Sequence, residues 1–140
     1  MPDQTLLAFD YGVKKIGVAI GNTLMRQARP LRILFSATRE QRFAGIEEIL
    51  AEWRPDKIIV GLPLALDGQE QYHSLRCRRF ANQLRGRYGL DVELVDERGS
   101  SMEAQQMLGT NADDDAMAAA VILQRYLDGL SMPHETSQRE

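Results

Sequence analysis

Three acidic residues stand where a folded sheet could bring them together. Asp10 follows an apolar run at residues 6–9, Glu97 follows an apolar strand pattern at 91–95, and Asp115 directly precedes an apolar helix pattern at 116–127. Carboxylates that converge without basic partners repel one another, so a pKa rises unless a cation joins them. Mg²⁺ and Mn²⁺ are hard cations that take oxygen ligands. The three acids therefore predict a site for a divalent cation, with Asp10, Glu97 and Asp115 as its ligands.

The chemistry expected of such a site is hydrolysis of a phosphodiester bond. Two divalent ions ~3.5 to 4 Å apart activate water and stabilise the leaving oxygen. A competing interpretation needs no metal, because Asp10 could simply cap the turn at Tyr11-Gly12. Lys14 and Lys15 would then supply the local counter-charge.

The first strand is the element on which the position of Asp10 depends. Leu6 to Phe9 form a continuous apolar run, which is typical of a strand buried on both faces. A helix pattern precedes each of two later apolar strands, so these strands should run parallel to the first. The predicted elements are strands at 6–9, 16–20, 30–35, 56–62 and 91–95, helices at 39–53, 70–88 and 116–127, and a short helix from Ser100 or Ser101 to Leu108.

This order predicts an α/β fold with a five-stranded mixed sheet, in the order βββαβαβα, flanked by helices. Right-handed crossovers place the fourth strand beside the first and the fifth beyond the fourth, which makes the first strand central. The ends of the first and fifth strands then share the edge where open α/β sheets bind ligands. At ~4.8 Å per strand they lie about 10 Å apart, a gap that Glu97 and a metal ion could close.

Length and composition indicate one globular domain. The chain has 140 residues, of which 44% are hydrophobic and 26% charged, and this excludes disordered, collagen-like and membrane classes. We expect a single domain over residues 1–130 and a disordered polar tail over 131–140. The longest apolar runs before the final helix are far shorter than the ~20 residues of a membrane span. The lone Cys77 cannot form an internal disulfide, so it should serve packing in a cytoplasmic protein.

Nucleic acid would have to bind through a local basic surface, because the net charge is -3. Backbone phosphates are bound by Lys and Arg whatever the base sequence. We predict phosphate contacts from Lys14, Lys15, Arg98, Arg76 and Arg79, within an arginine-rich helix that also carries Arg78, Arg85 and Arg87. The alternative is that this helix face is merely solvated.

Three further features near the acids allow a structural or a functional interpretation. Tyr11 could stack on a base or pack in the core. His73 could shuttle a proton or lie on the surface. Gly61-Leu62-Pro63 should shape the loop beside the site, because glycine allows close approach and proline is rigid.

Four segments resemble the motifs of a known family. They are FDYGVKKIGVAIG at 9–21, IIVGLPLALDG at 58–68, VELVDER at 92–98 and DDDAMAAAVILQRYL at 113–127. In this order they are similar to the YqgF family of pre-16S rRNA nucleases, also described as Holliday junction resolvases, which has a ribonuclease H-like fold. The resemblance implies that Asp10, Glu97 and Asp115 are the catalytic acids. Asp113 and Asp114 are alternatives to Asp115.

The sequence departs from the family pattern in two places. DERGSS at 96–101 has Gly99 where the family has an apolar residue, while Ser100 and Ser101 keep the capping hydroxyls. The segment between Leu108 and Asp115 is also shorter than the resemblance implies. Either a substrate loop has been trimmed, or residues are missing from the chain as given.

The function predicted first is a metal-dependent endonuclease that processes the 5′ end of pre-16S rRNA, acting on structured RNA within a ribosomal precursor particle. A second prediction is a Holliday junction resolvase for branched DNA, which must cut two strands and so calls for a homodimer rather than a monomer. A third comes from D-x-G-x-K-x-x-G at Asp10 to Gly17, which resembles the phosphate loop of actin-like ATPases, although those need two such domains. The fourth is a non-catalytic nucleic-acid-binding module, because a fold alone does not give activity.

Overall fold

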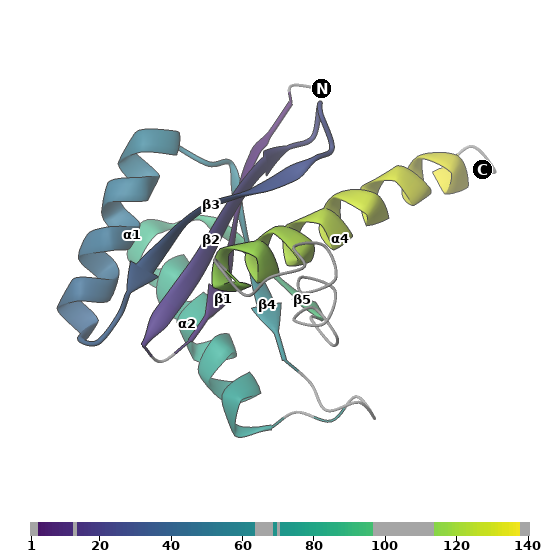
Figure 1. Cartoon of the computed structure of the whole chain (residues 1–140). Coiled ribbons are helices and arrows are strands. Elements are labelled where there is room, and N and C mark those ends of the chain that lie inside the picture. Colours follow the sequence, from purple (N-terminus) through teal and green to yellow (C-terminus); the bar gives the residue numbers. More distant parts are fainter. Residues whose placement is uncertain (1–2, 13, 64–68, 70, 97–113, 138–140) are drawn as a thin grey trace.

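A computed structural model describes residues 3–12, 14–63, 69, 71–96 and 114–137 (Figure 1). The strands are β1 (Thr5–Tyr11), β2 (Lys15–Asn22), β3 (Ala28–Phe35), β4 (Lys57–Leu62) and β5 (Asp91–Asp96). The helices are α1 (Arg39–Trp53), α2 (Tyr72–Tyr88) and α4 (Asp114–Ser137). Within the described helices, no stretch is both long and apolar enough to cross a membrane.

The five strands form one mixed sheet in the order β3-β2-β1-β4-β5. β1 pairs antiparallel with β2 and parallel with β4, and β4 pairs parallel with β5. β1 is therefore the central strand, as the apolar run and right-handed crossovers predicted. The α/β class and the mixed five-stranded sheet are confirmed.

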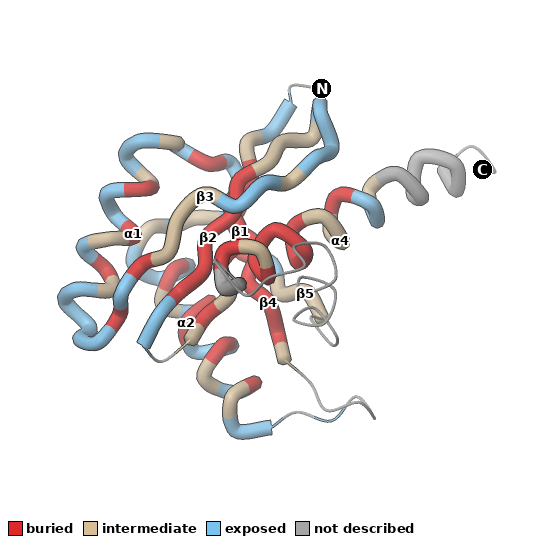
Figure 2. The backbone as a smooth tube through the Cα atoms, in the orientation of Figure 1, coloured by how far each residue is buried: buried red, intermediate tan, exposed pale blue. Residues whose placement is uncertain are grey.

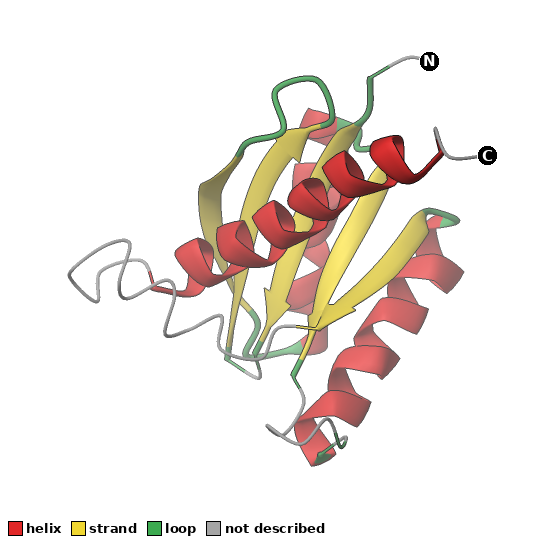
Figure 3. Ribbon diagram, turned by 90° about the vertical axis from the view of Figure 1, so that its right-hand side faces the viewer, coloured by secondary structure: helices red, strands yellow, loops and turns green. Residues whose placement is uncertain are grey.

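Side chains of β1 alternate between two cores, one on each face of the sheet. Leu7, Phe9 and Tyr11 belong to the core that α1 and α2 cover. Leu6 and Ala8 belong to the core under α4. Figure 3 shows α4 crossing one face of the sheet while the other helices lie behind it, and Figure 2 shows the buried residues concentrated in the central strands. The double burial explains why β1 has only apolar residues between Thr5 and Asp10.

Helix α4 approaches the sheet closely through small side chains. Ala119 is fully buried against the face that carries Ala8 and Ala19, and Ile122 and Leu123 fill the space beyond. Alanine combines high helix propensity with a small side chain, so this part of the sequence favours both the helix and its close packing.

Helices α1 and α2, on the face opposite α4, begin or end at residues that cap them. Thr38 accepts a hydrogen bond from the Gln41 amide at the start of α1 (3.0 Å). Arg54 takes a left-handed conformation (φ 47°) just before Pro55, and Gly89 takes one (φ 64°) after α2. The sequence predicted a helix that ends at residue 88, directly before Gly89, and this end is confirmed.

Several boundaries differ from those predicted. β3 begins at Ala28 rather than Pro30, because an edge strand tolerates a residue without an N–H, here beside a bulge opposite Val18-Ala19. α2 begins at Tyr72 rather than at residue 70. α4 continues to Ser137 and so includes residues 131–137, for which the sequence predicted a disordered tail. An established helix gains one hydrogen bond per added residue, which makes its end hard to predict. The predicted short helix from Ser100 or Ser101 to Leu108 lies outside the described residues.

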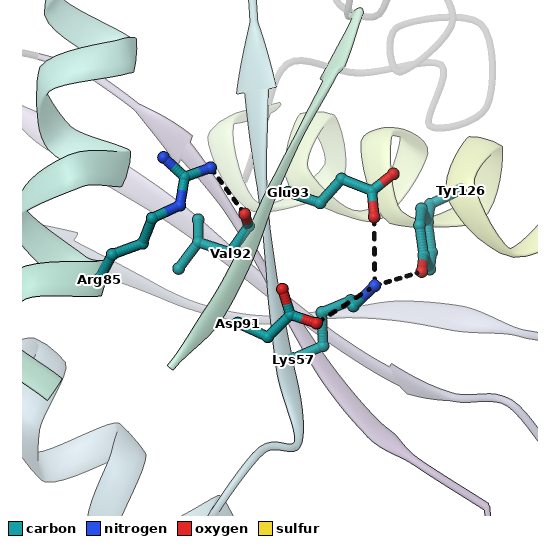
Figure 4. Close-up of polar contacts among 6 residues, drawn as sticks. All are labelled: Lys57, Arg85, Asp91, Val92, Glu93 and Tyr126. Carbon is teal, nitrogen blue, oxygen red and sulfur yellow. Dashed lines mark hydrogen bonds and ion pairs between the residues drawn. The ribbon is translucent and has the colours of Figure 1, made fainter. Parts of the chain in front are cut away.

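A polar cluster around Lys57 fastens α4 to the sheet (Figure 4). The Lys57 Nζ donates to the Tyr126 hydroxyl of α4 (3.1 Å) and to Glu93 Oε1 (3.1 Å), and it lies 3.5 Å from Asp91 Oδ2. The hydrogen bond with Tyr126 raises the pKa of Lys57, and Glu93 and Asp91 add to this, although partial burial acts in the opposite direction. Lys57 therefore stays charged and links α4 to β4 and β5.

We predict that Tyr126→Phe lowers the free energy of unfolding by about 1 kcal/mol, because Lys57 loses one acceptor while the ring packing remains. Urea denaturation would measure the change. Tyr72→Phe is the control, since Tyr72 is 74% exposed and its substitution should alter stability by less than about 0.5 kcal/mol. Equal effects of the two substitutions would contradict the role of the cluster.

Candidate active site

The candidate site lies at the sheet edge where three parallel strands end. Phe9 of β1 is in register with Val60 of β4, and Val60 with Leu94 of β5. One residue further along β1 is Asp10, and two residues further along β5 is Asp96. The common direction of these strands confirms that the chain following β5 leaves from the same edge as Asp10.

Asp10 is a half-buried carboxylate on the central strand, opposite Gly17 of β2. Side chains alternate along a strand, so Asp10 shares the face of Leu6 and Ala8, which α4 covers. Asp10 is thus a member of β1 itself, one residue before its end, and not a residue of the turn that follows. The predicted turn-capping role is less favoured by this position.

The backbone next to each of the other two predicted acids lies near Asp10. The residue before Glu97 is at the same edge of the sheet, and Asp115 belongs to α4, which covers the face that carries Asp10. Glu97 lies outside the described residues, but the residue before it, Asp96, ends β5, and its carbonyl accepts a hydrogen bond from Arg125 Nη1 of α4 (3.0 Å). Asp115 is the second residue of α4, next to Ala116, which lines a small cavity with Pro30 to Ile33 of β3. Ile33 is in register with Gly17, and Gly17 with Asp10. The alternatives to Asp115 stay open: Asp114 is the first residue of α4, and Asp113 lies outside the described residues.

Tyr11 and His73 pack beside Asp10 but on the opposite face. The Tyr11 ring is 6% exposed and stacks on Phe80, with centroids 4.6 Å apart, and on His73, at 6.2 Å. His73 is half-buried, and its Nε2 lies 3.1 Å from the Tyr11 carbonyl oxygen. The core-packing interpretation of Tyr11 is confirmed. His73 is thus only partly exposed, because it stacks on Tyr11, a contact that periodicity does not reveal. Its role as a proton shuttle or a surface residue stays a prediction.

Ser74 fixes the start of α2 at this edge. Its side chain is fully buried, donates to the Pro63 carbonyl just after β4, and accepts from the Gln71 amide (2.9 Å). The loop between β4 and α2 is therefore tied at both ends, which agrees with the expectation that Gly61-Leu62-Pro63 shapes this edge.

A basic cleft, which we call the arginine cleft, opens between the first turn of α1 and the N-terminal part of α2. It has a volume of about 350 Å³. Its lining consists of Arg39, Arg42, Arg76 and Arg79 with Tyr11, Tyr72, Leu75 and Gln83. The sequence analysis identified Arg76 and Arg79 but missed Arg39 and Arg42. In each pair the arginines are three residues apart on one helix, and the crossover topology puts both helices on one face of the sheet. This spacing and topology were the available signal.

The other predicted basic residues have different positions. Lys14 and Lys15 are exposed at the β1–β2 turn, beside the site, and Arg98 lies outside the described residues. Arg85 donates to the Val92 carbonyl of β5 (2.7 Å), as Figure 4 shows, and the Arg87 guanidinium lies 3.9 Å from the Phe43 ring centroid. Arg85 and Arg87 belong to the last turn of α2 and support the fold. Cys77 is buried in the core, as predicted.

The described side chains contain no cluster of three or more His, Cys, Asp or Glu residues that could bind a metal. Of the three predicted ligands, only Asp10 has a described side chain. Assignment of all three as metal ligands stays a prediction.

Comparisons with known proteins identify relatives over nearly the whole chain. The model of the RuvX family, described as Holliday junction resolvase, matches residues 4–129. A Bordetella pertussis protein named "Putative pre-16S rRNA nuclease" is 72% identical over 133 residues, which are 95% of this chain and 100% of the relative. A Burkholderia mallei protein of the same name is 54% identical over 137 residues, 95% of this chain and 94% of the relative.

Among solved structures, T. thermophilus RuvC in complex with Holliday junction substrate has a similar fold. Its TM-score is 0.57 at 16% identity, over 91% of this chain and 95% of that chain. Together, the family match and the relatives' names confirm the resemblance that the four sequence motifs indicate.

The short segment before Asp115 has two interpretations. Residues 97–113, which include most of this segment, lie outside the described residues. The choice between a trimmed loop and missing residues therefore stays a prediction, and the Bordetella relative matches over 100% of its length.

We predict that Ser74→Ala lowers the free energy of unfolding by about 1–3 kcal/mol, because the Pro63 carbonyl loses its donor and α2 loses an N-terminal acceptor. Chemical denaturation would measure this. Leu75→Ala on the same helix is the control: Leu75 is 58% exposed, so its change should stay within about 0.5 kcal/mol. A Ser74→Ala variant as stable as the parent would contradict the analysis.

Proposed function

Since this chain belongs to the RuvX family, described as Holliday junction resolvase, we propose that it is a metal-dependent nuclease that hydrolyses phosphodiester bonds of structured nucleic acid. The observation that carries this proposal is the half-buried carboxylate of Asp10 on the central strand, at the edge where β4 and β5 also end. A carboxylate at the carboxyl ends of parallel strands lies where open α/β sheets bind their ligands, and its oxygens suit a hard divalent cation. The family match favours a nuclease over the actin-like nucleotide-binding and non-catalytic interpretations.

In this proposal Asp10, Glu97 and Asp115 are the catalytic acids and the metal ligands. All three donors are carboxylate oxygens, a set suited to Mg²⁺ or Mn²⁺. A divalent ion bound there would activate the attacking water and stabilise the leaving oxygen. The protein supplies position: double burial fixes the β1 backbone at Asp10, and the Arg125 bond fixes β5 immediately before Glu97.

The substrate proposed first is the precursor of 16S rRNA, cut at its 5′ end. Support comes from the names of the relatives that match over 94–100% of their length. Exposed Lys14 and Lys15 lie at the turn beside Asp10, where they would meet phosphates on either side of the cleaved bond. We place this activity in the cytoplasm, on a ribosomal precursor particle.

Branched DNA is the second candidate substrate. The family description and the fold shared with RuvC support it. A resolvase must cut two strands in a symmetrical manner, so this function predicts a homodimer, whereas trimming one RNA end needs only a monomer. Sedimentation of the free protein and of its complex with a synthetic junction would separate the two cases.

We predict that Asp10→Asn reduces cleavage by more than about 100-fold, since even residues that merely support a metal ligand cost 10- to 100-fold. Cleavage of pre-16S rRNA 5′-end transcripts in Mg²⁺ would be measured beside circular dichroism. The matched control is Glu48→Gln, which neutralises an exposed carboxylate on α1 that forms a 3.4 Å pair with Arg32. Full activity in a folded Asp10→Asn protein would refute the proposal.

We also predict that Mg²⁺ or Mn²⁺ raises Tm, because an ion that binds only the folded protein stabilises it. At ten times the dissociation constant the gain is about 1.4 kcal/mol, which corresponds to a few degrees for a domain of this size. Asp10→Asn should abolish the shift, and Glu48→Gln should retain it. A shift of unchanged size in Asp10→Asn would place the ion elsewhere.

A further inference from the structure

We propose that the arginine cleft binds one backbone phosphate of a single nucleic-acid strand, on the face of the sheet opposite Asp10. The nature of the ligand rests on the proposed nuclease function. The site itself rests on the charge, burial and geometry of the residues that line the cleft.

The cleft is a concentration of positive charge without acidic partners. Its lining contains four arginines and no carboxylate. Within the part of the chain that the structure describes, ion pairs involve Arg32 and Lys57, and none of the four cleft arginines takes part. Arg39 and Arg42 belong to the first turn of α1, where the helix dipole adds partial positive charge. An anion would relieve this repulsion.

Two donors in the cleft arginines lack acceptors. Among the described residues, the Nε atoms of Arg42 and Arg76 are buried and have no hydrogen-bond partner. A buried donor without an acceptor is costly, and native proteins rarely leave one unmet. Phosphate oxygens are suitable acceptors for guanidinium groups, which bind them in bidentate geometry.

The guanidinium groups are already held in place by aromatic side chains. Arg42 lies over the Tyr11 ring, 5.3 Å from its centroid, and Arg76 Nη1 donates to the Tyr72 hydroxyl (3.0 Å). The hydrogen bonds with Tyr72 and then Tyr11 raise the pKa of Arg76, so it is charged at every physiological pH. Preorganised donors lose less conformational entropy when the ligand binds.

The position of Tyr11 connects the cleft to the proposed active site. Tyr11 follows Asp10 on β1, and the two side chains belong to opposite faces of the sheet. A strand whose cleaved phosphate lies near Asp10 would cross the end of β1 and reach the arginine cleft with a neighbouring phosphate. Tyr72 and Leu75, which are 74% and 58% exposed at the rim, offer a surface on which a base can stack.

The size of the cleft favours one strand over a duplex. Its volume of about 350 Å³ lies at the lower end of the ~300–1,000 Å³ range for small-ligand pockets. This suits a phosphate with its sugar. An acidic protein segment could also meet the arginines, but the proximity of Asp10 favours the strand on which the nuclease acts.

The first test measures binding of a labelled single-stranded oligonucleotide in EDTA, so that the result does not depend on cleavage. We expect Arg42→Gln/Arg76→Gln to weaken binding by about 10-fold or more and to make the slope of log K against log salt less negative by ~0.7 for the lost phosphate. The control is Arg78→Gln, which removes one positive charge, half the change in the double variant, from an exposed position of α2 outside the cleft. It should change affinity by less than about threefold.

The second test places a single neutral methylphosphonate at each position of the oligonucleotide in turn. With the parent protein, one position should lose affinity, and in Arg42→Gln/Arg76→Gln the same position should show no further loss. This coupling assigns one phosphate to the cleft. If the double variant does not fold, as judged by circular dichroism, Arg39→Gln/Arg79→Gln replaces it.

Outcomes of the two tests separate this inference from the nuclease proposal. Suppose that the methylphosphonate and the double variant are coupled in EDTA, but the parent protein cleaves nothing in Mg²⁺. That result would support the phosphate site in the cleft and contradict the nuclease proposal. Parent-like affinity and salt slope in the double variant, or inorganic sulfate bound in the cleft without any effect on the oligonucleotide, would overturn the inference. The inference would also be overturned if Arg42→Gln/Arg76→Gln lost affinity for an acidic peptide but kept parent-like affinity for the oligonucleotide.

Discussion

Burial of β1 on both faces is the constraint on which the rest of the structure depends. Leu6, Leu7, Ala8 and Phe9 are all fully buried, two toward α4 and two toward α1 and α2. Moving the strand by one residue would exchange the two faces and place every side chain in the wrong core. The register of β1 is therefore strongly specified. The face on which Asp10 lies is settled by the four residues before it, and the first polar residue after them can serve chemistry without disturbing the core.

Because side chains alternate along β1, groups of opposite charge lie on the two faces of the sheet at the end of this strand. On one face Asp10 contributes negative charge in a half-buried position, and on the other face Tyr11 forms the floor of a cleft with four arginines. Charges of opposite sign separated by a β-sheet do not neutralise one another by direct contact. Under the two proposals, each face would hold a separate ligand of opposite charge, a cation beside Asp10 and a phosphate in the arginine cleft, and one nucleic-acid strand would contact both.

The sequence predicted those features that depend on local patterns or on general rules of connection. The apolar run before Asp10 identified the central strand, and the predicted helix ends at residues 53 and 88 are those of α1 and α2, directly before a left-handed residue in each case. Contacts between distant segments were harder to predict. Arg39 and Arg42 belong to α1, and only its packing beside α2 gives them a common cleft with Arg76. The partial burial of His73 was hard to predict for the same reason, since it stacks on Tyr11, 62 positions earlier. The assignment of Glu97 and Asp115 still depends on the family resemblance.

Pro30 limits how copies of this chain can associate. It lies within β3, the outer strand of the sheet, beside the bulge opposite Val18-Ala19, and it has no N–H to donate to another strand. Proline and bulges on edge strands hinder sheet extension between molecules. At the opposite edge, Asp91 and Glu93 of β5 present charged groups around Lys57. A symmetrical dimer of this protein would therefore be joined through helices or loops, leaving the ends of β1, β4 and β5 unobstructed by an intermolecular sheet.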